Sequence, residues 1–352
     1  MGFEKEVKVC KRVNNTKRPY LVLNQLQCKH VPCSPLEALN MFDNLAIKLS
    51  KYAGNQRVLV VGFAETATAI GASIAMHLGC DYVNTTREVF DAEFIEFTES
   101  HSHATEQKLI KFYSQDYDRI IFVEDEVTTG NTIMKIVNKL QRLNPNFKFT
   151  VASLLNGMSD ENFNSYKEMN IEVVYLVKLD NSDYAERANA INTNGKIYDI
   201  RPIADRYMSF TCSNTRRITD SLDYEDSLNS ICAELPTFSD KTVLVLGTEE
   251  CMYPAIHIGA YIEGKGNTVF SHSTTRSPIA VSIDEGYPLQ ACYKLPSCYD
   301  SERNTFIYNL NKYDEVFIVT DAGSNSSGLT ALIYALKSVG NDKITVINLE
   351  VQ

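Results

Sequence analysis

The fold of this chain is decided by the stretch Ile120-Ile121-Phe122-Val123-Glu124-Asp125-Glu126-Val127-Thr128-Thr129-Gly130-Asn131-Thr132. Its apolar start, rich in β-branched and aromatic side chains, is typical of a buried strand. Two neighbouring acids follow, and then a polar turn. Beyond the turn, apolar residues recur at helical spacing, at Ile133, Ile136, Val137 and Leu140. The stretch therefore predicts a strand, a tight turn and a helix.

Such a turn suits a sugar phosphate. Ligands of an open α/β sheet bind beyond the carboxyl ends of its strands. A turn that opens a helix presents backbone N–H groups and the positive end of the helix dipole, which favour a phosphate. The threonines of the turn add hydroxyl donors, and Gly130 permits close approach of the backbone. The carboxylates of Glu124 and Asp125 would repel a phosphate but accept hydrogen bonds from sugar hydroxyls.

The stretch resembles the 5-phosphoribosyl 1-pyrophosphate (PRPP) binding signature of type I phosphoribosyltransferases, in which four apolar residues, two acids and a Thr-Thr-Gly-x-Thr turn follow one another. The resemblance implies an α/β fold with a doubly wound, mainly parallel sheet. It also implies that Glu124 and Asp125 hold the ribose hydroxyls. The residues implied to wrap the 5′-phosphate are Thr128, Thr129, Gly130, Asn131 and Thr132. The alternative is an ordinary strand–turn–helix with solvated acids.

A second strand–loop–helix pattern occurs earlier in the chain. Residues 57–62 form an apolar run that ends in glycine, and a helix pattern with Ile70, Ile74 and Leu78 follows. In the family that the chain resembles, the first such loop holds the pyrophosphate through backbone N–H groups. The residues implied here are Ala64, Glu65, Thr66 and Ala67. Glu65 is unusual, because an acid that points at pyrophosphate is unfavourable. It fits better as a partner of a metal, a hydroxyl or its own backbone.

Positive charge that could stabilise the leaving pyrophosphate comes from two places. One is Arg87, at the end of a short predicted strand, where an ion pair with Glu88 is the alternative. The other is a predicted polar loop, residues 98–108, in the position of the family's flexible lid. It carries His101, His103 and Lys108. A zinc site at the two histidines and a solvated loop without function are the alternatives.

The bulk properties favour a two-domain protein of the cytoplasm. The chain has 352 residues, 44% of them hydrophobic, and a net charge of −10. This charge argues against nucleic acid or an anionic membrane as the main partner. Nine cysteines without a CxxC pair indicate a reducing compartment. No apolar run approaches the ~18 residues of a membrane span, and the first residues lack an apolar signal core.

The second half repeats the pattern of the first. Residues 242–250 echo 57–65, residues 267–276 end in Thr-Thr-Arg as residues 81–87 do, and residues 313–321 parallel 117–125. We hypothesise that this half is a degenerate copy. Thr320 stands where the first acid should be, so the copy should bind PRPP poorly or not at all. A different strand order in the two halves would refute the duplication.

The residues Thr275-Arg276-Ser277-Pro278 resemble the signature of the TRSP domain, which follows a phosphoribosyltransferase domain in proteins associated with bacterial tellurium-resistance and stress operons. Arg276 and Asp321 mark a candidate second site. An acyl-, glycosyl- or phosphate-processing activity of this half is a further hypothesis. The domains predicted are an N-terminal extension (1–18), a phosphoribosyltransferase domain (19–200), a linker (201–240) and a TRSP-type α/β domain (241–352).

The resulting hypothesis is a PRPP-dependent transferase. The phosphoribosyl group would pass to a small base or base-like acceptor, with Mg²⁺ arriving on PRPP. Thr128 stands where purine enzymes often carry an aspartate, so the chain resembles the orotate type. By position alone, Asn156, Gly157 and Met158 would lie near the base. A homodimer is compatible with this interpretation, and a PRPP- or nucleotide-sensing protein without turnover is the alternative.

Overall fold

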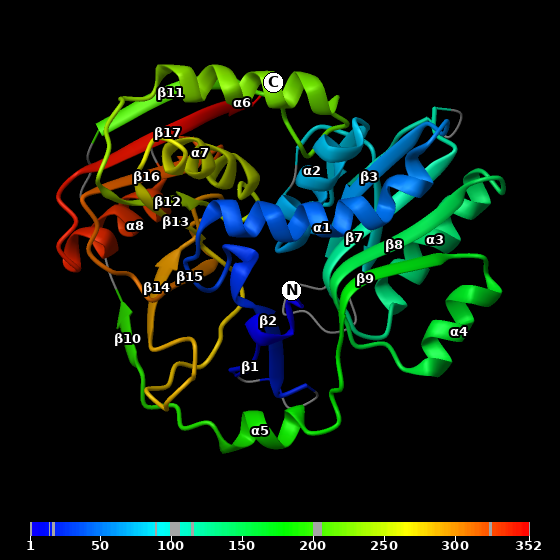
Figure 1. Cartoon of the computed structure of the whole chain (residues 1–352), viewed down its shortest axis with the longest axis horizontal. Helices are drawn as coiled ribbons and strands as arrows, with labels where there is room; N and C mark the ends of the chain where they lie inside the picture. Colours follow the sequence, from blue (N-terminus) through cyan, green and yellow to red (C-terminus); the bar gives the residue numbers. More distant parts are fainter. Residues whose placement is uncertain are drawn as a thin grey trace. The chain divides into compact units, whose positions relative to one another are not determined.

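Two five-stranded parallel sheets organise the chain, one in each of two units. The first unit comprises Met1–Phe3, Asn40–Asp180 and Ser213–Asp226. The second unit comprises Glu4–Leu39, Asn181–Cys212 and Ser227–Gln352. The computed structural model (Figure 1) describes residues 2–13, 15, 18–88, 90–98, 106–113, 116–199, 206–323 and 326–351.

The sheet of the first unit has the order β4-β3-β7-β8-β9, with all neighbours parallel. The chain builds β3 first, adds β4 on one side and then returns to add β7, β8 and β9 on the other. The order of the strands therefore reverses between β3 and β7, which is where open α/β sheets bind ligands. The elements in chain order are α1 (Pro35–Ala53), β3 (Val58–Gly62), α2 (Ala67–Leu78), β4 (Asp81–Asn84), β5 (Phe94–Thr98), β6 (Glu106–Ile110), β7 (Arg119–Val127), α3 (Asn131–Leu143), β8 (Lys148–Asn156), α4 (Asp160–Glu168) and β9 (Glu172–Lys178).

The predicted central strand and helix are confirmed. β7 is buried over its first five residues, and it continues through the two acids to Val127. Helix α3 buries the four apolar positions that the spacing predicted. Helix α2 packs closely on β3, because a Cβ atom at Gly71 would lie only 2.9 Å from the Cα atom of Gly62. Glycine at both positions therefore allows this helix to approach the sheet.

An antiparallel hairpin, β5 and β6, lies between β4 and β7 in the chain. The sequence predicted a polar loop as far as Lys108, and that boundary is wrong, because Glu106–Ile110 is a strand. Within it Gln107 and Leu109 are fully buried while Lys108 is half-buried, so the strand alternates. Because one of the two buried positions is a glutamine, the apolar residues alone do not show this alternation.

The sheet of the second unit has the order β13-β12-β16-β17-β11, again with all neighbours parallel. Its core combines α8 with β12, β16, β17 and the strands β14 and β15. The remaining elements are η1 (Glu4–Glu6), β1 (Val7–Lys11), β2 (Tyr20–Asn24), η2 (Gln25–Gln27), α5 (Tyr184–Ala190), β10 (Lys196–Asp199), β11 (Arg206–Cys212), α6 (Ser221–Glu234), β12 (Thr242–Gly247), α7 (Tyr253–Glu263), β13 (Thr268–Ser273), β14 (Ala291–Pro296), β15 (Asn304–Tyr308), β16 (Glu315–Thr320), α8 (Ser327–Ser338) and β17 (Ile344–Val351).

Four strands have the same order in both units: β4-β3-β7-β8 in the first and β13-β12-β16-β17 in the second. Along the chain, each unit has an antiparallel pair of strands between two strands of its sheet: β5 and β6 come between β4 and β7, and β14 and β15 come between β13 and β16. A threonine that follows β4 or β13 forms a bridge to this antiparallel pair: Thr86 pairs with Lys108, and Thr275 pairs with Phe306. The strand order that would have refuted a duplication is thus not found.

The described part of the predicted linker, residues 206–240, holds regular structure where the sequence suggested a connector. Strand β11 lies parallel to β17 at the edge of the second sheet, and α6 follows it. Ser209 and Thr211 of β11 are exposed while Met208, Phe210 and Cys212 face inward to differing degrees. An edge strand of this kind needs only one apolar face, and its signal is therefore weak. Among the described residues, no helix combines the length and apolarity needed to cross a membrane.

Candidate active site

Three polar segments of the first unit follow adjacent parallel strands. The predicted pyrophosphate loop follows β3, Arg87 lies just beyond β4, and the predicted phosphate turn follows β7. The carboxyl ends of parallel strands share one edge of a sheet, so these segments gather at the edge where the strand order reverses. The structure thus brings together the loop, the acids and the turn that the sequence singled out.

The turn after β7 depends on Gly130 and Tyr166. Gly130 has a φ of 77°, in the left-handed region, and is the N-cap residue of α3. The hydroxyl of Tyr166, from α4, donates to the carbonyl oxygen of Gly130 at 2.6 Å. A Cβ atom at Gly130 would lie 2.7 Å from two carbons of the Tyr166 ring. Burial, and then the carboxylate of Glu124, raise the pKa of Tyr166, so this hydroxyl stays a donor at neutral pH.

The N-terminus of α3 is open to a ligand. No side chain caps it at Gly130, and the Asn131 N–H donates to Thr129 Oγ1 at 3.3 Å. Within the described chain, the N–H groups of Thr132 and Ile133 make no hydrogen bond. Free N–H groups in the first turn and the helix dipole together form a site for an anion. Glu124 and Asp125 are half-buried in the last residues of β7, directly before this turn.

The loop after β3 has a similar arrangement. It leads into α2, which begins at Ala67. The N-cap residue Thr66 makes no side-chain cap, and its own N–H has no partner within the described residues. The peptide bond between Ala64 and Glu65 is cis. The carbonyl oxygen of Glu65 accepts from the hydroxyl of Thr68 at 3.1 Å, so the backbone of this residue is fixed locally.

The candidate catalytic cations have different positions. Arg87 is half-buried, one residue after Thr86, whose backbone pairs with that of Lys108. Lys108 lies in β6, and its ammonium group is 5.8 Å from the centre of the Phe94 ring. Neighbouring strand residues point to opposite faces, so Lys108 lies on the face of β6 opposite to Gln107. His101 and His103 lie outside the described residues.

Lys178 and Asn156 form a polar pair at the ends of β9 and β8. Lys178 Nζ donates to Asn156 Oδ1 at 3.1 Å and also to the carbonyl oxygen of Met158. Asn156 is fully buried, and its Nδ2 atom has no partner within the described chain. The sequence had placed residues 156–158 near the base by position alone and had not singled out Lys178, whose place in β9 gave no local signal.

Two protein families match successive parts of the chain. Residues 7–181 match the family described as "Phosphoribosyl transferase", and residues 214–336 match "TRSP domain C terminus to PRTase_2". The chain belongs to the phosphoribosyltransferases that carry a TRSP domain. It is therefore a PRPP-dependent pentosyltransferase, an enzyme that transfers a phosphoribosyl group to a base. A search of curated proteins gave no match.

Solved structures similar to this phosphoribosyltransferase include three adenine phosphoribosyltransferases. The enzyme of Rhodothermus marinus is 13% identical, with a TM-score of 0.38 over 50% of this chain and 96% of that one. The Trypanosoma brucei enzyme is 16% identical, with a TM-score of 0.38 over 50% and 77%. The Saccharomyces cerevisiae enzyme is 11% identical, with a TM-score of 0.38 over 50% and 96%. Similarity at this level carries no argument about the acceptor of this phosphoribosyltransferase.

In the second unit of the phosphoribosyltransferase, one buried carboxylate forms ion pairs with two arginines. Glu249, in the loop after β12, is fully buried. Its Oε2 atom accepts from Arg276 Nε at 2.5 Å and from Arg303 Nη2 at 3.1 Å, and Ser297 Oγ donates to Oε1. The ammonium group of the fully buried Lys29 donates to the carbonyl oxygen of Glu249 at 3.1 Å. Arg276, predicted as a second-site residue, is thus held by an acid of its own unit.

The other predicted second-site residue, Asp321, is also engaged. Its Oδ1 atom accepts from the hydroxyl of Tyr299 at 2.5 Å. Helix α8, which follows, is capped by Ser326, whose side chain accepts from the N–H of Leu329 at 3.1 Å. A Cβ atom at Gly328 would overlap the backbone of the Ser297–Cys298 peptide. The helix terminus that corresponds to the open end of α3 is therefore capped and covered.

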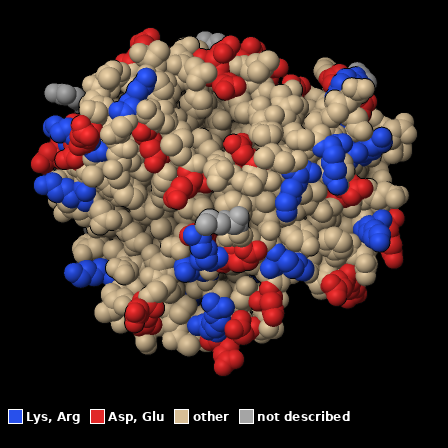
Figure 2. All heavy atoms as spheres, viewed as in Figure 1, with Lys and Arg blue, Asp and Glu red and all other residues tan. Residues whose placement is uncertain are grey.

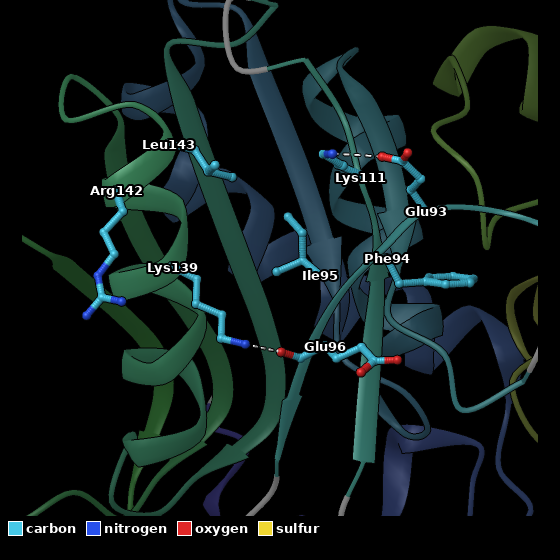
Figure 3. A pocket seen from close by; sticks show the side chains of 8 residues that line it. All are labelled: Glu93, Phe94, Ile95, Glu96, Lys111, Lys139, Arg142 and Leu143. Atoms are coloured by element: carbon cyan, nitrogen blue, oxygen red, sulfur yellow. Dashed lines mark hydrogen bonds and ion pairs between the residues drawn. The ribbon is translucent and has the colours of Figure 1, made fainter.

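A cavity of about 630 Å³ in the first unit has none of the predicted pyrophosphate-loop or phosphate-turn residues in its lining. Figure 3 shows it between the hairpin of β5 and β6 and the C-terminal half of α3. Two of the cations that line it are engaged: Lys111 pairs with Glu93 at 2.7 Å, and Lys139 donates to the Glu96 carbonyl oxygen at 2.5 Å. None of its lining residues was predicted as a site residue, and we assign it no catalytic role.

Charged side chains of both signs are interspersed on the face of the phosphoribosyltransferase that Figure 2 shows. The described residues of that face form no continuous basic surface. The prediction that nucleic acid is not a partner stays a prediction, as do the expected homodimer and the location in the cell.

Proposed function

We propose that the first unit carries the single PRPP site of this phosphoribosyltransferase and uses it to make a nucleotide-like product from a base that is not a purine. The observation that carries this proposal is the uncapped, glycine-initiated N-terminus of α3 directly after two carboxylates, at the point where the strand order reverses. It offers an anion site and a hydroxyl site within one turn, as PRPP requires.

The proposed roles follow the chemistry of each segment. Glu124 and Asp125 accept hydrogen bonds from the ribose hydroxyls, and the turn from Thr128 to Thr132 binds the 5′-phosphate. The loop from Ala64 to Ala67 binds the pyrophosphate at the uncapped N-terminus of α2. Arg87 is the cation placed beside these segments by its position after β4. The chain thus contributes orientation and electrostatic stabilisation of the departing pyrophosphate, and no covalent intermediate is needed.

Magnesium is expected to bind together with PRPP. In the described residues, no group of three or more histidine, cysteine or acidic side chains could hold a metal ion. The donor set at the site is the carboxylate pair of Glu124 and Asp125. That set fits Mg²⁺, which keeps several waters and takes its other ligands from substrate phosphates. When bound, the ion would neutralise part of the charge on the pyrophosphate.

The acceptor is proposed to be a pyrimidine-like or unusual base. Thr128 offers a hydroxyl where purine enzymes often carry an aspartate, so the site lacks a carboxylate at that place. Residues Asn156, Gly157 and Met158, at the end of β8, are proposed to lie near this base by their position in the sheet alone.

The test is release of pyrophosphate from PRPP and Mg²⁺ in the presence of a panel of bases. Asp125→Asn should lower kcat/KM by at least about tenfold, because a hydrogen bond to a charged group contributes about 1.5–3 kcal/mol. Asp116→Asn, which makes the same change at an exposed position before β7, should keep normal turnover. Equal activity of Asp125→Asn and the unaltered enzyme would refute the proposed site.

A further inference from the structure

A closed ring of three hydrogen bonds fixes the two peptide groups on either side of Ala64, in the proposed pyrophosphate loop. The N–H of Ala64 donates to Thr85 Oγ1 at 2.8 Å, and the Thr85 hydroxyl donates to Gln107 Oε1 at 2.7 Å. Gln107 Nε2 then donates to the carbonyl oxygen of Ala64 at 2.5 Å. A threonine hydroxyl has one proton to donate, and a glutamine amide has one acceptor oxygen and one donor NH2 group. Each bond of the ring therefore determines which atom donates and which accepts in the next one.

The ring is buried and is held from three directions. Thr85 and Gln107 are fully buried, and Ala64 is 5% exposed. The three residues come from the ends of β3 and β4 and from β6. The N–H of Thr85 donates to the carbonyl oxygen of Gly62 at 2.9 Å, and Thr86 exchanges two backbone bonds with Lys108, at 2.8 and 2.9 Å. The two peptide groups that flank Ala64 therefore cannot turn without breaking bonds that water cannot replace.

Ala64 lies three residues before the start of α2, the helix that would bind the pyrophosphate. The N–H of Thr66 is unbonded within the described chain, and α2 begins at the next residue. An anion at this terminus meets donors whose direction depends on the path of the loop from Ala64 onward. A site of this kind gains affinity when its donors are oriented before the ligand arrives.

We propose that Thr85 and Gln107 are positioning residues of the pyrophosphate site. They act through the two peptide groups that flank Ala64, which they hold so that the uncapped N-terminus of α2 is oriented for the pyrophosphate of PRPP. This inference rests on the proposed function, because it assumes that the loop binds pyrophosphate. It adds two residues to that function, neither of which the sequence had singled out.

The second unit supplies an internal comparison. There the N–H of Glu249 donates to Thr274 Oγ1 at 3.0 Å, which is the counterpart of the bond from Ala64 to Thr85. The residue that takes the place of Gln107 is Thr305, which donates to the carbonyl oxygen of Thr275 at 3.0 Å. The threonine bond thus recurs in both units, whereas the complete ring occurs in the unit with the PRPP motif.

The experiment compares four variants of the full chain. Thr85→Val and Gln107→Met remove the ring's bonds at nearly constant size. Thr85→Ser keeps the hydroxyl, and Thr274→Val makes the first change at the counterpart position in the second unit. Thermal unfolding establishes which variants are folded. The affinity for Mg²⁺-pyrophosphate is measured by calorimetry, and kcat and KM for PRPP are measured by pyrophosphate release.

We expect Thr85→Val and Gln107→Met to weaken pyrophosphate binding and raise KM for PRPP by about tenfold, the effect of one or two lost hydrogen bonds. Thr85→Ser and Thr274→Val should bind pyrophosphate as the unaltered enzyme does. If Thr85→Val does not fold, Gln107→Met alone decides. Folded variants with normal affinity would overturn the inference and leave the proposed function intact, as would an equal loss in Thr274→Val. An unaltered enzyme that binds neither pyrophosphate nor PRPP would remove the proposed function and the inference with it.

Discussion

At the scale of single residues, the predicted phosphate turn depends on Gly130, where any side chain is unfavourable. Gly130 combines a positive φ with contact to the Tyr166 ring. We predict that Gly130→Ala lowers the free energy of unfolding by about 2–4 kcal/mol, of which about 1–2 kcal/mol comes from the left-handed backbone and the rest from overlap with Tyr166. Chemical denaturation of the full chain measures this loss.

Gly79→Ala is the matched control for that variant. Gly79 belongs to the same unit and has a φ of 60°, but a Cβ atom there would meet nothing within 4 Å. Its replacement should cost only the backbone term, about 1 kcal/mol. Losses of equal size in the two variants would show that the contact with Tyr166 does not matter.

The residues of the site differ in how far the sequence could predict them. The acids and the turn are contiguous, so their order alone indicated a sugar phosphate. Tyr166 and Gln107 reach the site from residues 36 and 43 positions away from their partners. Such contacts are set by the packing of whole elements, and no local pattern contains them. The buried Gln107 even hid the strand in which it lies.

At the scale of elements, the corresponding helices α3 and α8 of the two units differ at their N-caps. Helix α3 begins at a glycine without a side-chain cap, whereas α8 is capped by Ser326. We predict that Ser326→Ala lowers the free energy of unfolding by about 1 kcal/mol, because it leaves the Leu329 N–H without its acceptor. Denaturant unfolding of the full chain tests this.

The control lies at the other end of α8. Ser338 donates to the carbonyl oxygen of Ala335 at 2.7 Å and caps no N–H group. Ser338→Ala should therefore change stability by less than about 0.5 kcal/mol, as surface substitutions usually do. If the two serine variants lose the same stability, the N-cap is not what stabilises α8.

Elements were predicted best where one pattern filled the whole element. β3, β7 and the buried face of α3 have continuous or regularly spaced apolar residues, and these were found. β11 was missed because it lies at a sheet edge and alternates with polar residues. The pairing of β10 with β14 joins residues about 95 positions apart, and its register is fixed by neither strand alone.

At the scale of the whole molecule, the chain has two similar sheets, and in the described residues the helix terminus after β7 is uncapped whereas that after β16 is capped. In the second unit, Glu249 accepts from Arg276, and the start of α8 lies against the Ser297–Cys298 backbone. These differences favour a single PRPP site in the first unit. We predict that calorimetric titration with PRPP and Mg²⁺ finds one site per chain. Asp125→Asn should weaken that site, whereas Asp321→Asn should leave both the affinity and the number of sites unchanged. A second saturable site that Asp321→Asn removes would contradict this prediction.

The division of the chain also sets an order of events during translation. Cys33 pairs with Ser271, and Arg12 pairs with Ile279. The ribosome makes these partners about 240 or more residues later, which at 5–20 residues per second takes about 12 s or longer. All five strands of the first sheet emerge within that interval. The nascent chain can therefore complete the five-stranded sheet of the first unit while the antiparallel pair of β1 and β2 still waits for its partners and is exposed to chaperones and proteases.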